Sequence, residues 1–171
     1  MWIWLCVIAG TVILDQLTKW LAVAFLMGKD SFVLIPSVFR FTYVENDGAA
    51  FGMLDDHRWI FMVISTVAIV GLLVFLLKFA PDSRWVKVGL ALIIGGGIGN
   101  MIDRVALGYV IDFLDFCAFP NLWPWVFNLA DSFVCVGGGI VFVWCVVSLI
   151  KEVRDNRAKG KEEISSDGEN L

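Results

Sequence analysis

The segment ADSFVCVGGGIVFVWCVVSLI, residues 130–150, carries a single charged residue, Asp131, which stands close to its beginning. As a helix it is long enough to cross the roughly 30 Å hydrocarbon core of a bilayer. Three other stretches have comparable length and character: Trp4–Leu26, Trp59–Phe79 and Trp85 to about Ile102. The chain of 171 residues is 59% hydrophobic with a mean hydropathy of +0.81, which is typical of membrane proteins. We therefore predict an all-α integral membrane protein with four transmembrane helices.

The cations that flank these segments predict how they cross the membrane. More of them lie beside the second connection and after the last segment than beside the first and third connections. By the positive-inside rule, both termini then face the cytoplasm, and the first and third connections lie outside. The cations on the inner side are Lys78, Arg84, Lys87, Lys151, Arg154, Arg157, Lys159 and Lys161, and those on the outer side are Lys29, Arg40, Arg58 and Arg104.

The two outer connections carry their own structural signals. Phe39 to Val44 alternates aromatic with other side chains, which predicts a strand, and Asn46-Asp47-Gly48 predicts a turn. We expect a small extracytoplasmic β element over about residues 31–56, with a lid-like segment near Ala49 to Asp55. The second outer segment, Asp103–Asn128, is expected to lie along the membrane interface.

The domain organisation is simple. Residues 1–150 are predicted to form a single transmembrane domain. Residues 151–171 have mixed charge and include Ser165-Ser166-Asp167-Gly168, so we expect a disordered cytoplasmic tail.

Two glycine clusters predict a helix contact. Gly95-Gly96-Gly97 with Gly99, and Gly137-Gly138-Gly139, fall at comparable depth in the third and fourth spans. Small residues let helix backbones approach closely in a membrane, although glycine is also common in transmembrane helices for other reasons. A contact between these spans would bring Asp131 close to Asp112.

Polar residues gather at the predicted outer ends of the spans. Asp112, within Val-Ile-Asp-Phe, and Asp131 stand among apolar neighbours, where an unpaired carboxylate is costly. If the fold brings them together, they form a proton-sharing pair suited to acid/base hydrolysis. The other polar residues on this side are Asp15, Lys19, Asn46, Asn100, Asp103, Arg104 and Asn128.

Each supporting residue also has an ordinary structural explanation. Asp15 and Lys19 have the i,i+4 spacing of an internal ion pair, which we weigh equally with a role in orienting a ligand. Arg104 fits a snorkelling cation, and Asn100 and Asn128 fit helix caps. These separate explanations leave the convergence of so many polar groups on one side unexplained.

Five segments, in this order, resemble the motif boxes of bacterial lipoprotein signal peptidase (signal peptidase II), a family of membrane aspartyl proteases. The resemblance extends from about residue 4 to residue 150. Each segment alone is a weak signal, but five in order on a four-span chain are a strong one. The segments are DQLTK at 15–19, NDGAAF at 46–51, GNMIDR at 99–104, GYVIDF at 108–113 and FNLAD at 127–131.

The resemblance implies an aspartyl endopeptidase of the bacterial cytoplasmic (inner) membrane, with its active site at the extracytoplasmic face. Its substrates would be prolipoproteins that carry a diacylglyceryl group on a cysteine, cut immediately before that cysteine. It implies that Asp112 and Asp131 are catalytic and that membrane lipid is a partner, and we expect a monomer. The supporting residues would be Asp15, Lys19, Asn46, Gly48, Asn100, Arg104 and Asn128, of which Asn46, Asn128 and Arg104 are candidates to hold the substrate backbone.

Other functions fit the sequence less well. His57 is the only histidine and no His-Glu-x-x-His motif occurs, so we expect no metal and no cofactor. The formal net charge of −4 argues against nucleic-acid binding. A small proton- or ion-coupled transporter is the alternative, because intramembrane carboxylates can relay charge, and a noncatalytic scaffold is a third possibility. Against transport, the acidic pair falls at one surface and clear inverted repeats are missing.

Overall fold

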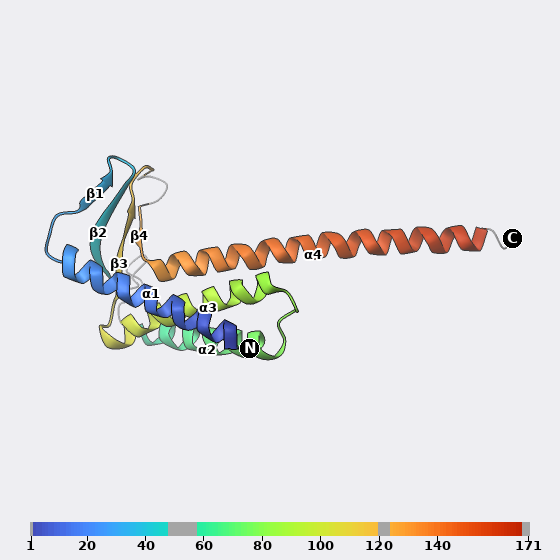
Figure 1. Cartoon of the computed structure of the whole chain (residues 1–171), viewed down its shortest axis with the longest axis horizontal. Helices are drawn as coiled ribbons and strands as arrows, with labels where there is room; N and C mark the ends of the chain where they lie inside the picture. The colour runs from blue at the N-terminus through green and yellow to red at the C-terminus, as the bar shows by residue number, and fades with distance from the viewer. Residues whose placement is uncertain (1, 48–57, 120–123, 169–171) are drawn as a thin grey trace.

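The computed structural model describes residues 2–47, 58–119 and 124–168. Three helices lie side by side, and a fourth begins beside them and continues far past them (Figure 1). A small sheet stands at the end of the bundle opposite the chain's C-terminus. The helices are α1 (Trp2–Leu26), α2 (Arg58–Lys78), α3 (Arg84–Ala106) and α4 (Leu129–Gly168).

These helices confirm the prediction of a four-helix membrane fold with a small β element. Segments Trp2–Leu26, Arg84–Ala106 and Leu129–Arg157 are each long and apolar enough to cross a membrane, and Met62–Lys78 within α2 is a shorter apolar helix. Many large apolar side chains point outward, among them Trp20 of α1. Such an exposed apolar surface is stable in lipid, because its exposure to water would cost free energy.

The helix α3 packs against each of the other three helices. Its contact with α4 runs through backbone atoms: a Cβ on Gly96 would lie 2.4 Å from the carbonyl oxygen of Ala130. Nearer the start of α3, Gly89 faces Gly137 of α4. A Cβ on Gly89 would lie 2.8 Å from the carbonyl oxygen of Gly137, and a Cβ on Gly137 would lie 2.5 Å from that of Gly89. The predicted contact between the third and fourth spans is therefore present, but Gly96 meets Ala130 rather than the second glycine cluster.

The remaining glycines of α3 face other partners. A Cβ on Gly95 would collide with Thr11 of α1, and one on Gly99 would lie 2.4 Å from a carboxylate oxygen of Asp15. Gly97 faces Ile69 of α2. The glycine cluster thus lets three helices approach α3 on three sides, which places the polar ends of α1, α3 and α4 together.

The β element is larger than the sequence predicts. It is an antiparallel sheet in the order β1 (Phe32–Ile35), β2 (Phe39–Asn46), β3 (Val110–Phe116) and β4 (Val126–Phe127). The predicted strand at Phe39–Val44 is confirmed within β2. The segment 103–128, expected along the interface, contains the end of α3 and the strands β3 and β4. Its Val, Ile and Phe residues suit a strand, and pairing with the distant β2 provides the backbone hydrogen bonds.

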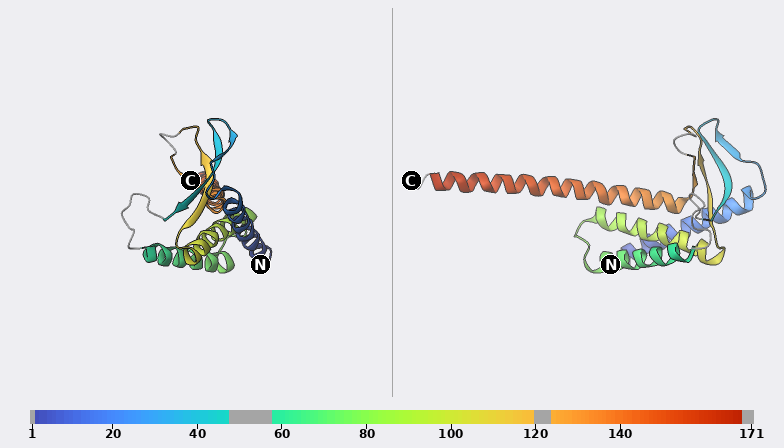
Figure 2. Two further views of the ribbon diagram at one scale, coloured as in Figure 1. Left: turned by 90° about the vertical axis from the view of Figure 1, so that its left-hand side faces the viewer. Right: turned by 180° about the vertical axis from the view of Figure 1, so that it is seen from behind.

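The structure also differs from the prediction after residue 150. The helix α4 continues through Gly168, where the sequence predicts a disordered tail (Figure 2). Lys, Glu, Arg and Ala in this stretch favour helix, and a helix that extends an existing one needs no new nucleus. The predicted lid near Ala49 to Asp55 lies outside the described residues.

Gly96→Ala should lower the melting temperature of the protein in detergent. The added methyl group must push α4 away from α3, and overpacking of this kind costs about 1–3 kcal/mol. Gly138→Ala is the matched control, since a Cβ there meets nothing within 4 Å. Thermal unfolding followed by tryptophan fluorescence measures both variants, and equal melting temperatures would contradict the close α3–α4 contact.

Candidate active site

The structure brings the two predicted catalytic aspartates to one residue, Asn128. Asp112 lies in β3 and is buried, and Asp131 lies in the first turn of α4. The Nδ2 of Asn128 donates to Oδ1 of Asp112 at 2.7 Å, and its backbone N–H donates to Oδ2 of Asp131 at 3.1 Å. A single residue therefore holds both carboxylates, which we call the aspartate pair.

Each member of the pair has a second amide donor. Asn46, at the end of β2, donates from Nδ2 to Oδ2 of Asp112 at 2.7 Å. Asn100 of α3 donates from Nδ2 to Oδ1 of Asp131 at 2.7 Å. Both oxygens of each carboxylate thus accept a hydrogen bond from a group of fixed orientation.

The N-terminus of α4 is capped by the same residues. Oδ1 of Asn128 accepts the backbone N–H of Asp131 at 2.9 Å, and the Asp131 carboxylate accepts the N–H of Asn128 in return. This reciprocal arrangement is a capping box. Asp15 of α1 adds an acceptor for the N–H of Ala130 at 2.9 Å. The positive end of the helix dipole therefore faces the Asp131 carboxylate.

Behind the aspartate pair lies a buried ammonium group. Lys19 is 2% exposed, and its Nζ lies 3.0 Å from Oδ2 of Asp15 and 2.8 Å from Oδ2 of Asp103. It also donates to Oδ1 of Asn100 at 2.9 Å. Three acceptors match the three N–H donors of an ammonium group, so this buried charge is fully satisfied. We call Lys19, Asp15, Asp103 and Asn100 the Lys19 cluster.

The Lys19 cluster determines how Asn100 faces the site. Because Oδ1 of Asn100 accepts from Lys19 and from Nδ2 of Asn128, at 2.9 and 3.0 Å, its Nδ2 must point the other way. That direction leads to Asp131. The predicted ion pair of Asp15 and Lys19 is present, and Lys19 also orients the side chain of Asn100, which donates to Asp131. A role for this pair in orienting a substrate stays a prediction.

Gln16 adds to the Lys19 cluster, and Asp103 links it to the sheet, although the sequence proposes neither residue as a supporting residue of the site. Gln16 donates from Nε2 to Oδ1 of Asp103 at 3.0 Å and to Asp15 at 3.2 Å. Asp103 accepts the backbone N–H of Ile111 at 3.1 Å, and so holds β3 next to Asp112. Asp103 could have been proposed from the sequence, because it is a charged residue at the end of a predicted span. Gln16 could not, because its hydrogen-bond partners lie largely on α3, far away in the sequence.

Arg104 lies at the edge of this network. Arg104 donates from a guanidinium nitrogen to the backbone oxygen of Asn100 at 3.4 Å. With Asp131 and Asn100 it lines a cavity of about 340 Å³ between α2, α3 and α4. We call this the α2–α4 cavity. Gly48 lies outside the described residues.

The Asp112 carboxyl has a perturbed affinity for protons. Its pKa is raised from 3.8 to about 6; burial is the largest cause, and the charge of Asp131 acts in the same direction. The hydrogen bonds from Asn46 and Asn128 act against this shift, because they favour the ionised form. Since the folded protein holds this proton more tightly, the contribution of Asp112 to stability falls as the pH rises from about 4 to about 6. Perturbation of this kind is typical of functional sites.

Two solved structures share this fold. A bacterial membrane enzyme determined by the in meso method at 1.9 Å resolution is similar with a TM-score of 0.77 and 32% identity, covering 85% of this chain and 93% of that one. A second, at 2.3 Å resolution, has a TM-score of 0.74 and 32% identity, covering 90% of each chain. The fold is therefore that of a bacterial membrane enzyme.

The family follows from sequence comparison. The model of signal peptidase (SPase) II matches residues 7–147. The lipoprotein signal peptidase of Caldanaerobacter subterraneus subsp. tengcongensis is 48% identical over 135 residues, covering 79% of this chain and 90% of that protein. The lipoprotein signal peptidase of Halalkalibacterium halodurans is 41% identical over 152 residues, covering 89% and 92%. The chain belongs to the signal peptidase II family, and it is a multi-pass peptidase of the cell membrane. The resemblance carried by the five motif segments is confirmed.

The Asp112 carboxyl should titrate near pH 6 and should titrate lower in Asp131→Asn, because that change removes a neighbouring negative charge. Infrared difference spectra against Asp112→Asn isolate its carboxyl band. Asp82→Asn, which removes an exposed carboxylate paired with Lys87, is the control and should leave the band unchanged. A band that is ionised throughout the range from pH 4 to pH 8, or that Asp131→Asn does not move, would contradict the coupling.

Lys19→Met should destabilise the protein strongly. It leaves Asp15 and Asp103 buried without their cation, and breaking a buried ion pair costs about 3–5 kcal/mol. Lys87→Met is the matched control, because Lys87 pairs with the fully exposed Asp82 and its loss should have little effect. Urea or thermal unfolding in detergent compares the two variants. Equal stability would show that the Lys19 cluster contributes nothing.

Proposed function

We propose that this chain removes the signal peptide from bacterial prolipoproteins that carry a diacylglyceryl group on a cysteine. The cut falls immediately before that cysteine, and Asp112 and Asp131 activate the water that makes it. The observation that carries the proposal is the pair of hydrogen bonds from Asn128, one to each carboxylate. They support a shared reaction site for two acidic groups from distant parts of the chain.

The chemistry requires one protonated and one ionised carboxyl group. Two close carboxylates in a poorly solvated site resist carrying charge together, so the pair holds one proton that belongs to both members. The ionised member takes a proton from water, whose oxygen attacks the scissile carbonyl carbon. The protonated member hydrogen-bonds the carbonyl oxygen and then delivers a proton to the leaving amine. Hydrolysis then needs no covalent intermediate.

The surrounding residues have distinct roles in this proposal. Asn46, Asn100 and Asn128 direct amide N–H groups at the carboxylates and so orient the oxygens that must meet water and substrate. Asn46, Asn128 and Arg104 are the residues that the sequence offers as holders of the substrate backbone. Asn128 donates to both Asp112 and Asn100, and Asn46 donates to Asp112. Arg104 lines the α2–α4 cavity together with Asp131, which favours it as the residue that contacts substrate. We propose that part of an acyl chain of the substrate enters the apolar part of that cavity.

The protein's placement in the membrane is part of the proposal. We infer that both termini are cytoplasmic and that the aspartate pair lies at the extracytoplasmic face, as the distribution of cations predicts. The sheet and the aspartate pair lie at the same end of the helix bundle, which supports a site at one surface. A transporter site would be expected near the membrane midplane. We further propose that the enzyme acts as a monomer.

Asp112→Asn and Asp131→Asn should each leave a folded protein and lower the cleavage of a diacylglyceryl precursor by several orders of magnitude. Either change removes a proton-transfer group, while the amide keeps the size of the side chain. Purified variants are incubated with lipidated precursor in detergent, and products are located by mass spectrometry. Near-normal cleavage by either variant would reject the pair.

Asp115→Asn is the matched control, because Asp115 lies on the same strand but pairs with Arg40 on β2. It should keep turnover close to that of the unchanged protein. The same digest with a nonlipidated precursor tests the substrate class. Equal cutting of both precursors would contradict recognition of the lipid while leaving the aspartate pair intact.

A further inference from the structure

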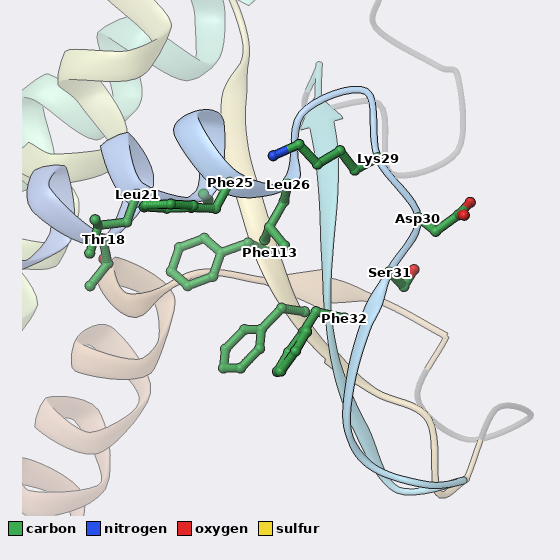
Figure 3. A pocket seen from close by; sticks show the side chains of 11 residues that line it. Thr18, Leu21, Phe25, Leu26, Lys29, Asp30, Ser31, Phe32 and Phe113 are labelled. Carbon is green, nitrogen blue, oxygen red and sulfur yellow. The ribbon is translucent and has the colours of Figure 1, made fainter.

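A second cavity lies between the C-terminal end of α1 and the sheet (Figure 3). Its volume of about 610 Å³ falls within the range of roughly 300–1,000 Å³ that small-ligand sites occupy. Four aromatic rings line it, those of Phe25, Phe32, Phe41 and Phe113. The rings of Phe32 and Phe41 are stacked, with centroids 6.4 Å apart. We call this the α1–sheet pocket.

The α1–sheet pocket continues the surface that faces lipid. Leu17, Trp20 and Phe25 of α1 are exposed along the helix that leads to it. At its other side, every residue of β1 (Phe32–Ile35) is apolar and exposed. In a protein of the cell membrane, such surface is covered by acyl chains, and the pocket is an indentation in that surface. The ligand available to it is therefore a lipid of the surrounding leaflet.

The rim of the pocket includes one cation, Lys29, and one carboxylate, Asp30. Lys29 follows the helix end and is exposed, and no carboxylate lies within ion-pair distance of it among the described residues. Figure 3 shows its ammonium group turned toward the end of α1, whereas the carboxylate of the neighbouring Asp30 points away to the other side. A phosphate group above the pocket would meet the positive charge, so the rim complements a phospholipid headgroup.

The pocket is separate from the aspartate pair. Asp112 and Phe113 are consecutive residues of β3, so their side chains project to opposite faces of the sheet. Asp112 faces Asn46 and Asn128, while Phe113 faces the pocket. The α2–α4 cavity, beside Asp131, is lined by other helices. The α1–sheet pocket therefore opens on the other face of β3 from the aspartate pair.

We propose that the α1–sheet pocket binds one phospholipid of the surrounding leaflet, with an acyl chain among the phenylalanine rings and its phosphate at Lys29. The bound chain fills the space between α1 and β3, the strand that carries Asp112. The lipid is then a structural part of the enzyme, and it joins the sheet to the helix bundle. This binding site does not depend on the cleavage reaction proposed above.

Photochemical cross-linking tests the site in the full chain. The protein is placed in phosphatidylcholine nanodiscs that contain a phosphatidylglycerol with a diazirine on one acyl chain, and cross-linked peptides are mapped by mass spectrometry. We expect adducts in residues 21–41 and 110–116. Phe32→Asp should reduce them at least about tenfold, because it places a charge among apolar groups. Val33→Asp is the matched control, being 54% exposed against 59% for Phe32 and outside the pocket lining.

A second variant keeps the test valid if Phe32→Asp does not fold. Lys29→Glu should lower the yield of adducts severalfold through repulsion of the phosphate, whereas Lys151→Glu, at an exposed cation far from the sheet, should not. Asp112→Asn should give the same cross-linking pattern as the unchanged protein. The lipid site is therefore tested independently of the proposed cleavage reaction. Adducts spread evenly along the lipid-facing helices, adducts confined to the α2–α4 cavity, or adducts unchanged by both Phe32→Asp and Lys29→Glu would overturn the proposal.

Discussion

The buried ammonium group of Lys19 is the constraint on which the polar end of this protein depends. It cannot lie among transmembrane helices without acceptors, and Asp15, Asp103 and Asn100 supply one for each of its donors. Two of these acceptors are on α3 and one is on α1, so satisfying the charge also sets the distance and rotation of the two helices. Misplacement of either helix would leave a buried charge unpaired, which makes the arrangement specific.

The three residues that accept hydrogen bonds from Lys19 each make a further hydrogen bond, and these bonds position the aspartate pair. Asp15 also caps the N-terminus of α4, Asp103 also holds the backbone of β3, and Asn100 also donates to Asp131. The aspartate pair is thus the outer layer of a network whose inner layer is the Lys19 cluster. The glycines of α3 make the network possible, because a Cβ at Gly99 would occupy the position of the Asp15 carboxylate.

The two faces of strand β3 lie in different environments, one polar and one apolar. On one face Asp112 is held by amide donors, and on the other Phe113 packs in an apolar cluster with Ala22 and Ile111. The polar face carries the proposed catalytic Asp112, whereas the apolar face packs against α1. A strand achieves this separation because successive side chains alternate between faces.

The sequence by itself determined the membrane class, the helical segments and the family, because long apolar runs and ordered motifs are local properties of the chain. It also singled out Asp112 and Asp131, since a carboxylate among apolar residues is conspicuous. Only the tertiary structure decided that Asp112 stands on a strand paired with β2 and that Gln16 contacts Asp103 of the Lys19 cluster. The partners of β3 and of Gln16 lie dozens of residues away, and no local pattern encodes a hydrogen bond made across that distance.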